Sequence, residues 1–253
     1  MSKAIVTGGL GFIGFELCLS LLEEGMEVVA ADSAGEAGER WLEVGRNANI
    51  TYQPLQQQVS DEFSSACTYI NLYDHFTGNK TGQHLKEVLD FVERNRSCME
   101  SAVILLPSVL SSRINEEEFL DVLDFLGKSQ FNKQCTVYLP TLFGPHQPES
   151  FLFQQICTNK EGAGSEYVDD SRSAIFVKDA AAALMNIEQK ASADKIQFVS
   201  DIPDSWEESL QSLGGPDVRQ KQEVKDILPA GVKKVVVTSS SSVNEVMESQ
   251  RNN

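Results

Sequence analysis

The chain has few basic residues for its size. Its 253 residues include 37 Asp and Glu but only 21 Lys and Arg, which gives a formal net charge of −16 at pH 7 with His neutral. A protein that binds the phosphate backbone of a nucleic acid needs a basic face that displaces counterions. The charge balance therefore argues against a nucleic-acid partner.

Cysteines and long apolar runs are also scarce. The five cysteines are odd in number and lack C-x-x-C spacing, so the sequence predicts free thiols, no disulfide framework and no metal site. No apolar run approaches the roughly 18 residues that a membrane-spanning helix needs. Residues 1–3 do not resemble the start of a signal peptide, so we expect a cytoplasmic protein without a membrane partner.

The most informative stretch is residues 3–32. Residues 4–6 predict a buried strand, residues 12–22 an amphipathic helix, and residues 27–31 a second strand. A glycine-rich turn joins the first strand to the helix, so the stretch predicts a βαβ unit.

Three glycines in this turn have separate physical roles. Gly8 suits the positive φ of a tight turn, Gly11 leaves room for a pyrophosphate against the backbone, and Gly14 lets the helix lie close to the sheet. Asp32 ends the second strand, where a carboxylate accepts hydrogen bonds from ribose hydroxyls and repels a 2′-phosphate. The unit predicts a dinucleotide site that favours NAD over NADP.

Strands and helices alternate along the rest of the chain, which predicts an α/β fold with a Rossmann-like, doubly wound parallel sheet and a small C-terminal lobe. Further strands are expected at residues 50–52, 67–72, 101–106, 135–139, 173–177, 196–200 and 235–237, and helices at residues 85–92, 116–128, 151–157 and 179–189. We divide the chain into a dinucleotide-binding core (residues 1–145), a reduced substrate-side lobe interleaved with it (146–237) and a polar tail (238–253).

Four segments in chain order resemble motifs of the extended short-chain dehydrogenase/reductases, the NAD-dependent nucleotide-sugar epimerases and dehydratases. They are the nucleotide turn at residues 7–14, the N-x-x-G helix start at 79–82, the V-Y-G-P turn at 142–145, and the R-D-F-I-x-V-x-D-x-A segment at 171–181. The resemblance implies NAD as cofactor and a nucleotide-sugar as substrate. The cofactor-binding residues that it implies are Thr7, Gly8, Gly11, Phe12, Ile13, Gly14, Asp32, Gln58 and Asn79.

The catalytic pair of that family is missing. Its hydride-transfer chemistry uses a Tyr base with a Lys four residues later, together with a Ser or Thr. The two places fall near Ser112 and Glu116, and no Tyr-x-x-x-Lys occurs in the sequence. Where the family has a small Ala-Ala pair after the fourth strand, this chain has Tyr73-Asp74, which we expect to crowd or repel the nicotinamide end.

Three other residues have two interpretations each. Ser108 matches the family's catalytic serine or merely ends a strand in a turn. His75 is part of an Asp–His base or a solvated loop histidine. Arg172 matches the arginine that holds a nucleotide-sugar diphosphate, or it forms a surface ion pair.

Three functions follow from these observations. The leading hypothesis is an NAD(P)-binding protein of the epimerase/dehydratase type that is non-catalytic, acting as a cofactor sensor or scaffold, or that has altered chemistry. The second is an active nucleotide-sugar epimerase or reductase that uses Ser108 with Tyr73, Asp74 or His75. The third is an interaction module that forms a homodimer through the helices at residues 85–94 and 116–128.

Overall fold

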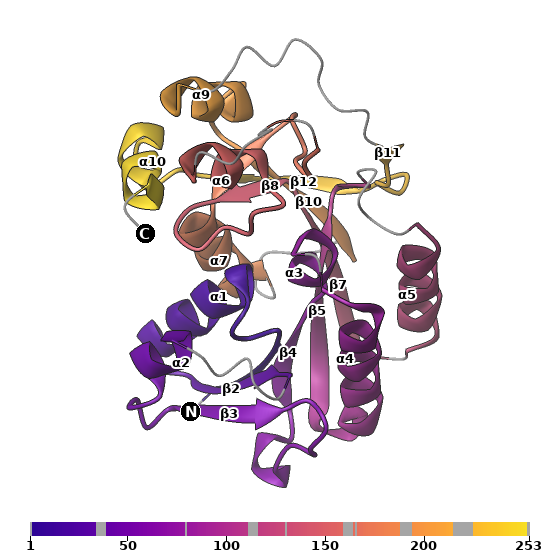
Figure 1. Cartoon of the computed structure of the whole chain (residues 1–253). Helices are drawn as coiled ribbons and strands as arrows, with labels where there is room; N and C mark the ends of the chain where they lie inside the picture. Colours follow the sequence, from indigo (N-terminus) through magenta and orange to yellow (C-terminus); the bar gives the residue numbers. More distant parts are fainter. Residues whose placement is uncertain are drawn as a thin grey trace.

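The structure is a computed structural model that describes residues 2–33, 39–78, 80–110, 116–129, 131–158, 164, 166–187, 194–214 and 225–251. One large parallel sheet runs through it with helices on both faces (Figure 1). The α/β class and the doubly wound parallel sheet predicted from the sequence are confirmed.

The large sheet has eight strands in the order β12-β10-β7-β5-β4-β1-β2-β3. All seven neighbouring pairs are parallel. Its strands are β1 (Lys3–Thr7), β2 (Glu27–Asp32), β3 (Ile50–Pro54), β4 (Ala66–Asn71), β5 (Met99–Pro107), β7 (Lys133–Leu139), β10 (Lys195–Ser200) and β12 (Lys233–Val237). The order reverses between β1 and β4, and crevices at the carboxyl ends of such strands are where open α/β sheets bind ligands.

Two pairs of short strands lie outside this sheet. β6 (Val109–Leu110) pairs antiparallel with β11 (Lys225–Asp226), and β8 (Thr141–Phe143) pairs parallel with β9 (Ala174–Phe176). Both pairs lie beyond the carboxyl ends of β5 and β7, so they border the region where a substrate is expected.

The helices form two layers (Figure 1). The first layer packs on one face of the sheet and contains α1 (Phe12–Glu23), α2 (Glu39–Val44) and α7 (Val177–Met185). The second packs on the other face and contains α4 (Gly82–Arg94) and α5 (Glu116–Lys128). Short helical segments at α3 (Tyr73–Thr77), η1 (Asp61–Phe63) and η2 (Arg96–Cys98) complete this half.

The central strand β5 shows why a sheet covered on both faces has continuous apolar strands. Its residues 101–107 are all buried. Val103 and Leu105 pack in the core under α1 and α7, whereas Ile104 and Leu106 pack under α4 and α5.

A third apolar core lies beyond the carboxyl ends of the strands. It is built around Trp206, Phe153 and Tyr167, which come from the α6 (Leu152–Cys157) and α9 (Ser205–Ser212) region. Figure 1 shows α6 and α9 side by side with α10 (Val243–Arg251) in this part of the molecule.

The end of the chain differs from the prediction. We expected residues 238–253 to be a polar tail, but α10 packs Val246 and Met247 into the third core. The buried amide of Gln250 accepts a hydrogen bond from the Gly144 N–H and donates to Gln147. The helix has only three apolar side chains, Val243, Val246 and Met247, so its hydrophobic pattern was too sparse to predict it.

Candidate functional site

The glycine-rich turn lies at the carboxyl-terminal edge of the sheet. Gly8 has a φ of +62°, and its carbonyl accepts a hydrogen bond from the Gly11 N–H across 2.9 Å. A Cβ atom on Gly14 would lie 1.9 Å from that same carbonyl oxygen. The turn therefore requires glycine at both ends, as the sequence predicted on steric grounds.

The carboxylate of Asp74 lies against this turn. Its Oδ1 accepts a hydrogen bond from the Ile13 N–H and its Oδ2 accepts one from the Gly14 N–H, each across 3.2 Å. The side-chain amide of Asn71 donates to the same Oδ2 across 2.7 Å. These backbone N–H groups at the start of α1 are the ones expected to bind a diphosphate.

Asp32 ends β2 as predicted, but its side chain is buried, with 1% of its surface exposed. Its two oxygens accept hydrogen bonds from the backbone N–H groups of Leu10 (3.0 Å) and Ser33 (2.9 Å). Asp32 thus holds the glycine-rich turn against the end of β2. Its predicted contact with a ribose stays a prediction.

The other predicted cofactor residues fall into three groups. Thr7 and Phe12 are buried, and the Thr7 hydroxyl accepts a hydrogen bond from the Asn71 N–H across 3.0 Å. Gln58 is exposed in the loop after β3. Asn79, together with the catalytic position at Ser112, lies outside the described residues.

Tyr73 fills space at the carboxyl ends of β5 and β7. Its hydroxyl donates to the Pro140 carbonyl across 2.8 Å and accepts from the Leu142 N–H across 3.0 Å. The ring stacks on Phe151 with centroids 6.3 Å apart. Burial raises the pKa of Tyr73 well above its ordinary value, so this phenol is a poor base.

Ser108 lies at the buried end of a polar network that reaches the surface. Its hydroxyl donates to Asp170, and Asp170 also accepts two hydrogen bonds of 2.7 Å from the guanidinium of Arg172. A third Arg172 nitrogen donates to Asp226 of β11 across 2.7 Å. The arginine predicted to hold a substrate diphosphate is therefore engaged by two carboxylates of its own chain.

Tyr73 and Ser108 line one small cavity. Its volume is about 10 Å³, and Thr77, Val168 and Asp170 contribute to its wall. This is about the volume that one water molecule needs. The space between the predicted catalytic residues therefore has no room for a sugar ring or a nicotinamide in this arrangement.

Comparison with known proteins shows which proteins this chain resembles. Residues 4–85 match the family described as "NAD dependent epimerase/dehydratase family". UDP-glucose 4-epimerase 4 of Oryza sativa subsp. japonica is 25% identical over 173 residues, which are 64% of this chain and 46% of that protein. The match therefore spans about half the length of the curated relative.

Solved structures agree on the fold. The NAD-dependent NDP-hexosamine 5,6-dehydratase TunA superposes with a TM-score of 0.62 and 14% identity, covering 100% of this chain and 97% of that one. Epimerase Mth375 of Methanothermobacter thermautotrophicus gives 0.60 and 16%, covering 99% and 91%. The chain resembles NAD-dependent nucleotide-sugar epimerases and dehydratases. This confirms the resemblance found in the sequence motifs.

The cofactor of this family does not fit the turn of this epimerase/dehydratase-like chain as it stands. A diphosphate needs free N–H groups at the start of α1, and those of Ile13 and Gly14 are bound by Asp74. A second anion at the same place would also face the Asp74 charge at close range.

His75 lies apart from the small cavity. We expected a loop residue, but His75 is in α3, with 3% of its surface exposed. Its ring stacks on His84, with the two Nδ1 atoms 3.4 Å apart, and its Nε2 lies 3.6 Å from a Glu118 oxygen. Burial and the neighbouring His84 lower its pKa to about 4, so the imidazole is neutral near pH 7.

Sequence reasoning missed the residues that organise the epimerase/dehydratase-like site. Asp74 was considered as a residue that crowds the nicotinamide and as a catalytic partner of Ser108 or His75, whereas its carboxylate binds the helix start. Arg40 of α2, which donates to the carbonyls of Leu10 and Gly11, was not considered at all. One signal was available, because α1 has no acidic residue in its first turn and no side-chain cap, so its first N–H groups need a partner from elsewhere.

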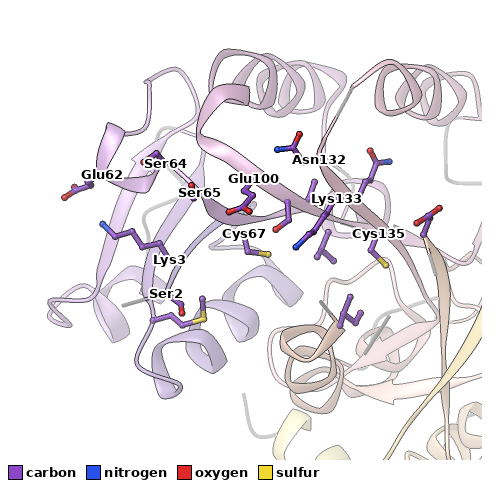
Figure 2. Close-up of a pocket in the computed structure, with 17 residues that line it drawn as sticks. Ser2, Lys3, Glu62, Ser64, Ser65, Cys67, Glu100, Asn132, Lys133 and Cys135 are labelled. Atoms are coloured by element: carbon purple, nitrogen blue, oxygen red, sulfur yellow. The ribbon is translucent and has the colours of Figure 1, made fainter. Parts of the chain in front are cut away.

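The opposite edge of the sheet carries a larger pocket, with a volume of about 720 Å³ (Figure 2). The described residues that line it include Lys3, Cys67, Glu100, Lys133 and Cys135, and none of the predicted site residues is among them. Burial and Asp194 raise the pKa of the Cys135 thiol to about 11, so it stays protonated near pH 7. Because its lining residues lie at the amino ends of the strands, the pocket is separate from the glycine-rich turn at their carboxyl ends.

The described residues offer neither a metal site nor a membrane-spanning helix. They contain no group of three or more His, Cys, Asp or Glu side chains that could hold a metal ion. None of the helices in that part of the chain has the length and apolar character needed to cross a bilayer.

Proposed function

We propose that this chain is a non-catalytic relative of the nucleotide-sugar epimerases and dehydratases, and that it acts as a scaffold rather than by hydride transfer. The observation that carries the proposal is the position of Tyr73. Both hydrogen-bonding capacities of its hydroxyl are used by backbone groups, and the cavity beside it has a volume of about 10 Å³.

The chemistry of the remaining groups supports the same conclusion. A catalytic tyrosine of this kind needs a lowered pKa, and burial moves that of Tyr73 in the opposite direction. The Ser108 hydroxyl donates to Asp170, and the described part of the chain places no lysine in the lining of this cavity. His75, the other candidate base, does not line it either.

Turnover assays test the proposal. MoeE5 has been solved with NAD and UDP-glucose or UDP-glucuronic acid, so these are the first ligands to use. We expect no epimerised, dehydrated or oxidised product when the protein is incubated with NAD and a panel of UDP- and dTDP-sugars. Turnover that disappears in Tyr73→Phe or Ser108→Ala would show an active enzyme and refute the proposal.

A second candidate function, a homodimeric interaction module, is favoured by one observation. Leu120 and Leu123 on α5 are 54% and 36% exposed, although α5 packs its other side on the sheet. These two leucines give α5 an exposed apolar surface that a second copy of the chain would cover. A cytoplasmic location stays a prediction from the sequence.

A further inference from the structure

The start of α1 needs hydrogen-bond acceptors from another part of the chain. The first N–H groups of any helix have no partner within the helix. In α1 the residue before the helix is Gly11, which has no side chain to accept from them. A bound diphosphate satisfies such groups in dinucleotide-binding proteins.

Asp74 satisfies two of them here. Its carboxylate spans two successive donors, Ile13 and Gly14, through one oxygen each. This bidentate arrangement, with backbone N–H groups pointing at two oxygens, is the geometry by which a helix start binds one phosphate group. Asp74 is separated from these donors by about sixty residues, and the structure brings it there through β4 and the first turn of α3.

The carboxylate is fixed by further contacts. The Asn71 amide donates to its Oδ2, and the Asp74 backbone N–H donates back to the Asn71 Oδ1 across 3.2 Å. Asp74 has only 6% of its surface exposed. The pKa of Asp74 is raised on balance, because burial outweighs the hydrogen bonds from Asn71, Ile13 and Gly14 and the charge of Arg40, which lower it.

The carboxylate also occupies the space that Gly11 leaves open. A Cβ atom on Gly11 would lie 2.4 Å from the Asp74 Oδ2. The sequence predicted that this glycine keeps a side chain out of the way of a pyrophosphate. In the structure, an oxygen of Asp74 occupies the space that a side chain at Gly11 would fill.

We propose that Asp74 is an internal substitute for the cofactor diphosphate, that it closes the glycine-rich turn to dinucleotides, and that removal of this one carboxylate uncovers an anion-binding site. The proposal deepens the proposed function, because a scaffold that transfers no hydride can keep the turn permanently filled. The ligand class of the uncovered site is a phosphate or diphosphate group.

Calorimetric titration with inorganic pyrophosphate, ADP and NAD tests the proposal on four proteins. They are the wild type, Asp74→Ala, Asp74→Asn and Glu16→Gln. Asp74→Ala removes the carboxylate, and Asp74→Asn removes the charge but keeps an acceptor oxygen. Glu16→Gln makes the same change of net charge on a mostly buried side chain of α1, whose carboxylate interacts with Arg40. The Ile13 and Gly14 N–H groups stay bound to Asp74 in this variant.

We expect Asp74→Ala to bind pyrophosphate and NAD at least about tenfold more tightly than the wild type and Glu16→Gln do. Asp74→Asn should lie between them. Wild-type binding of NAD as tight as that of Asp74→Ala would overturn the proposal. A folded Asp74→Ala protein, checked by circular dichroism, that binds neither ligand would also overturn it.

The wild-type protein gives an independent measurement if the variants do not fold. We expect the amide resonances of Ile13 and Gly14 to stay unchanged when pyrophosphate is added, and shifts at these two amides would overturn the proposal. Sugar turnover by the wild type would remove the proposed function. Pyrophosphate binding by the wild type without turnover would remove only this inference.

Discussion

Arg172 Nη1 lies 2.7 Å from Asp226 Oδ2, so β11 is tied to the segment that the sequence matched to a substrate-binding motif. The same guanidinium donates twice to Asp170. The two carboxylates differ strongly in exposure, since the Asp170 side chain is 3% exposed and that of Asp226 is 55% exposed. Together the two carboxylates raise the pKa of Arg172, which therefore stays charged at all pH values of interest.

This difference in exposure predicts different stability effects for two isosteric substitutions. Asp170→Asn removes the buried charge that accepts two hydrogen bonds from Arg172 and should lower the free energy of unfolding by about 1.5–3 kcal/mol. Asp226→Asn breaks an exposed pair and should lower it by about 0.2–1 kcal/mol. Urea unfolding followed by circular dichroism measures both. Equal losses would mean that Asp226 is more buried in solution than its exposure here indicates.

Two glycines in helices predict alanine effects of opposite sign. An added Cβ at Gly14 of α1 would lie 1.9 Å from the Gly8 carbonyl oxygen, whereas at Gly127 of α5 it would meet nothing within 4 Å. Gly14→Ala must displace backbone and should destabilise the protein by about 2 kcal/mol or more. Gly127→Ala should stabilise it by about 0.5–1 kcal/mol, because alanine is the better helix former. Thermal unfolding of both variants checks the prediction, and a stabilised Gly14→Ala would contradict the close helix approach.

The lowered pKa of His75 predicts that the folded protein loses stability in acid. Its pKa is lowered to about 4 by burial and by His84. The unfolded chain, with an ordinary His pKa near 6.5, therefore binds more protons than the folded chain between these values. Stability should fall as the pH drops from about 6.5 towards 4, by about 1–3 kcal/mol from this group. Urea unfolding at several pH values measures it.

The control for His75 is His146, which is exposed. His75→Gln should flatten the difference between pH 6.5 and pH 4, and His146→Asn should leave it unchanged. Other titrating groups are common to all three proteins and cancel in the comparison. A His75→Gln profile that parallels the wild type would show that His75 is not held neutral by its surroundings.

The raised pKa of Asp169 predicts that its contribution to the free energy of unfolding changes with pH in the direction opposite to that of His75. Burial raises its pKa to about 6, although the Leu152 N–H and the Trp206 indole N–H both donate to it. The folded chain then binds more protons than the unfolded chain between about pH 4 and pH 6. Its contribution to stability is complete below pH 4 and is lost as the pH rises through 6. Asp169→Asn should remove this pH dependence, which the same urea series detects; an unchanged slope would contradict the raised pKa.

The sequence predicted the sheet well because its strands are continuous apolar runs. The predicted strand at residues 101–106 lies inside β5, and the predicted helix at residues 116–128 has the bounds of α5. Gly8 and Gly14 also have the backbone roles that their spacing indicated. These features depend on local pattern and sterics, which a sequence displays directly.

The contents of the site could not be predicted in the same way. Asp74 reaches α1 across sixty positions, and nothing in its local sequence shows which N–H groups its carboxylate will meet. Tyr73 was expected to crowd the cofactor, but its bonds to Pro140 and Leu142 depend on how β7 ends and β8 begins. Long-range polar contacts of this kind are decided by tertiary packing.

The exposed leucines of α5 predict a homodimer that single substitutions can disrupt. Leu120 and Leu123 are 54% and 36% exposed and lie three residues apart on one helix, so they form a pair of neighbouring apolar side chains whose burial against a partner is favourable. We expect light scattering to give the mass of a dimer for the wild type and of a monomer for Leu120→Glu.

The matched control is Leu42→Glu, because Leu42 of α2 is 77% exposed on the other helical layer. Since both substitutions add one negative charge to a chain that already carries −16, a loss of the dimer in both variants would indicate charge repulsion rather than a contact through α5. A wild-type monomer would exclude the dimeric module, whereas a dimer that survives Leu42→Glu but not Leu120→Glu places the interface on this helix.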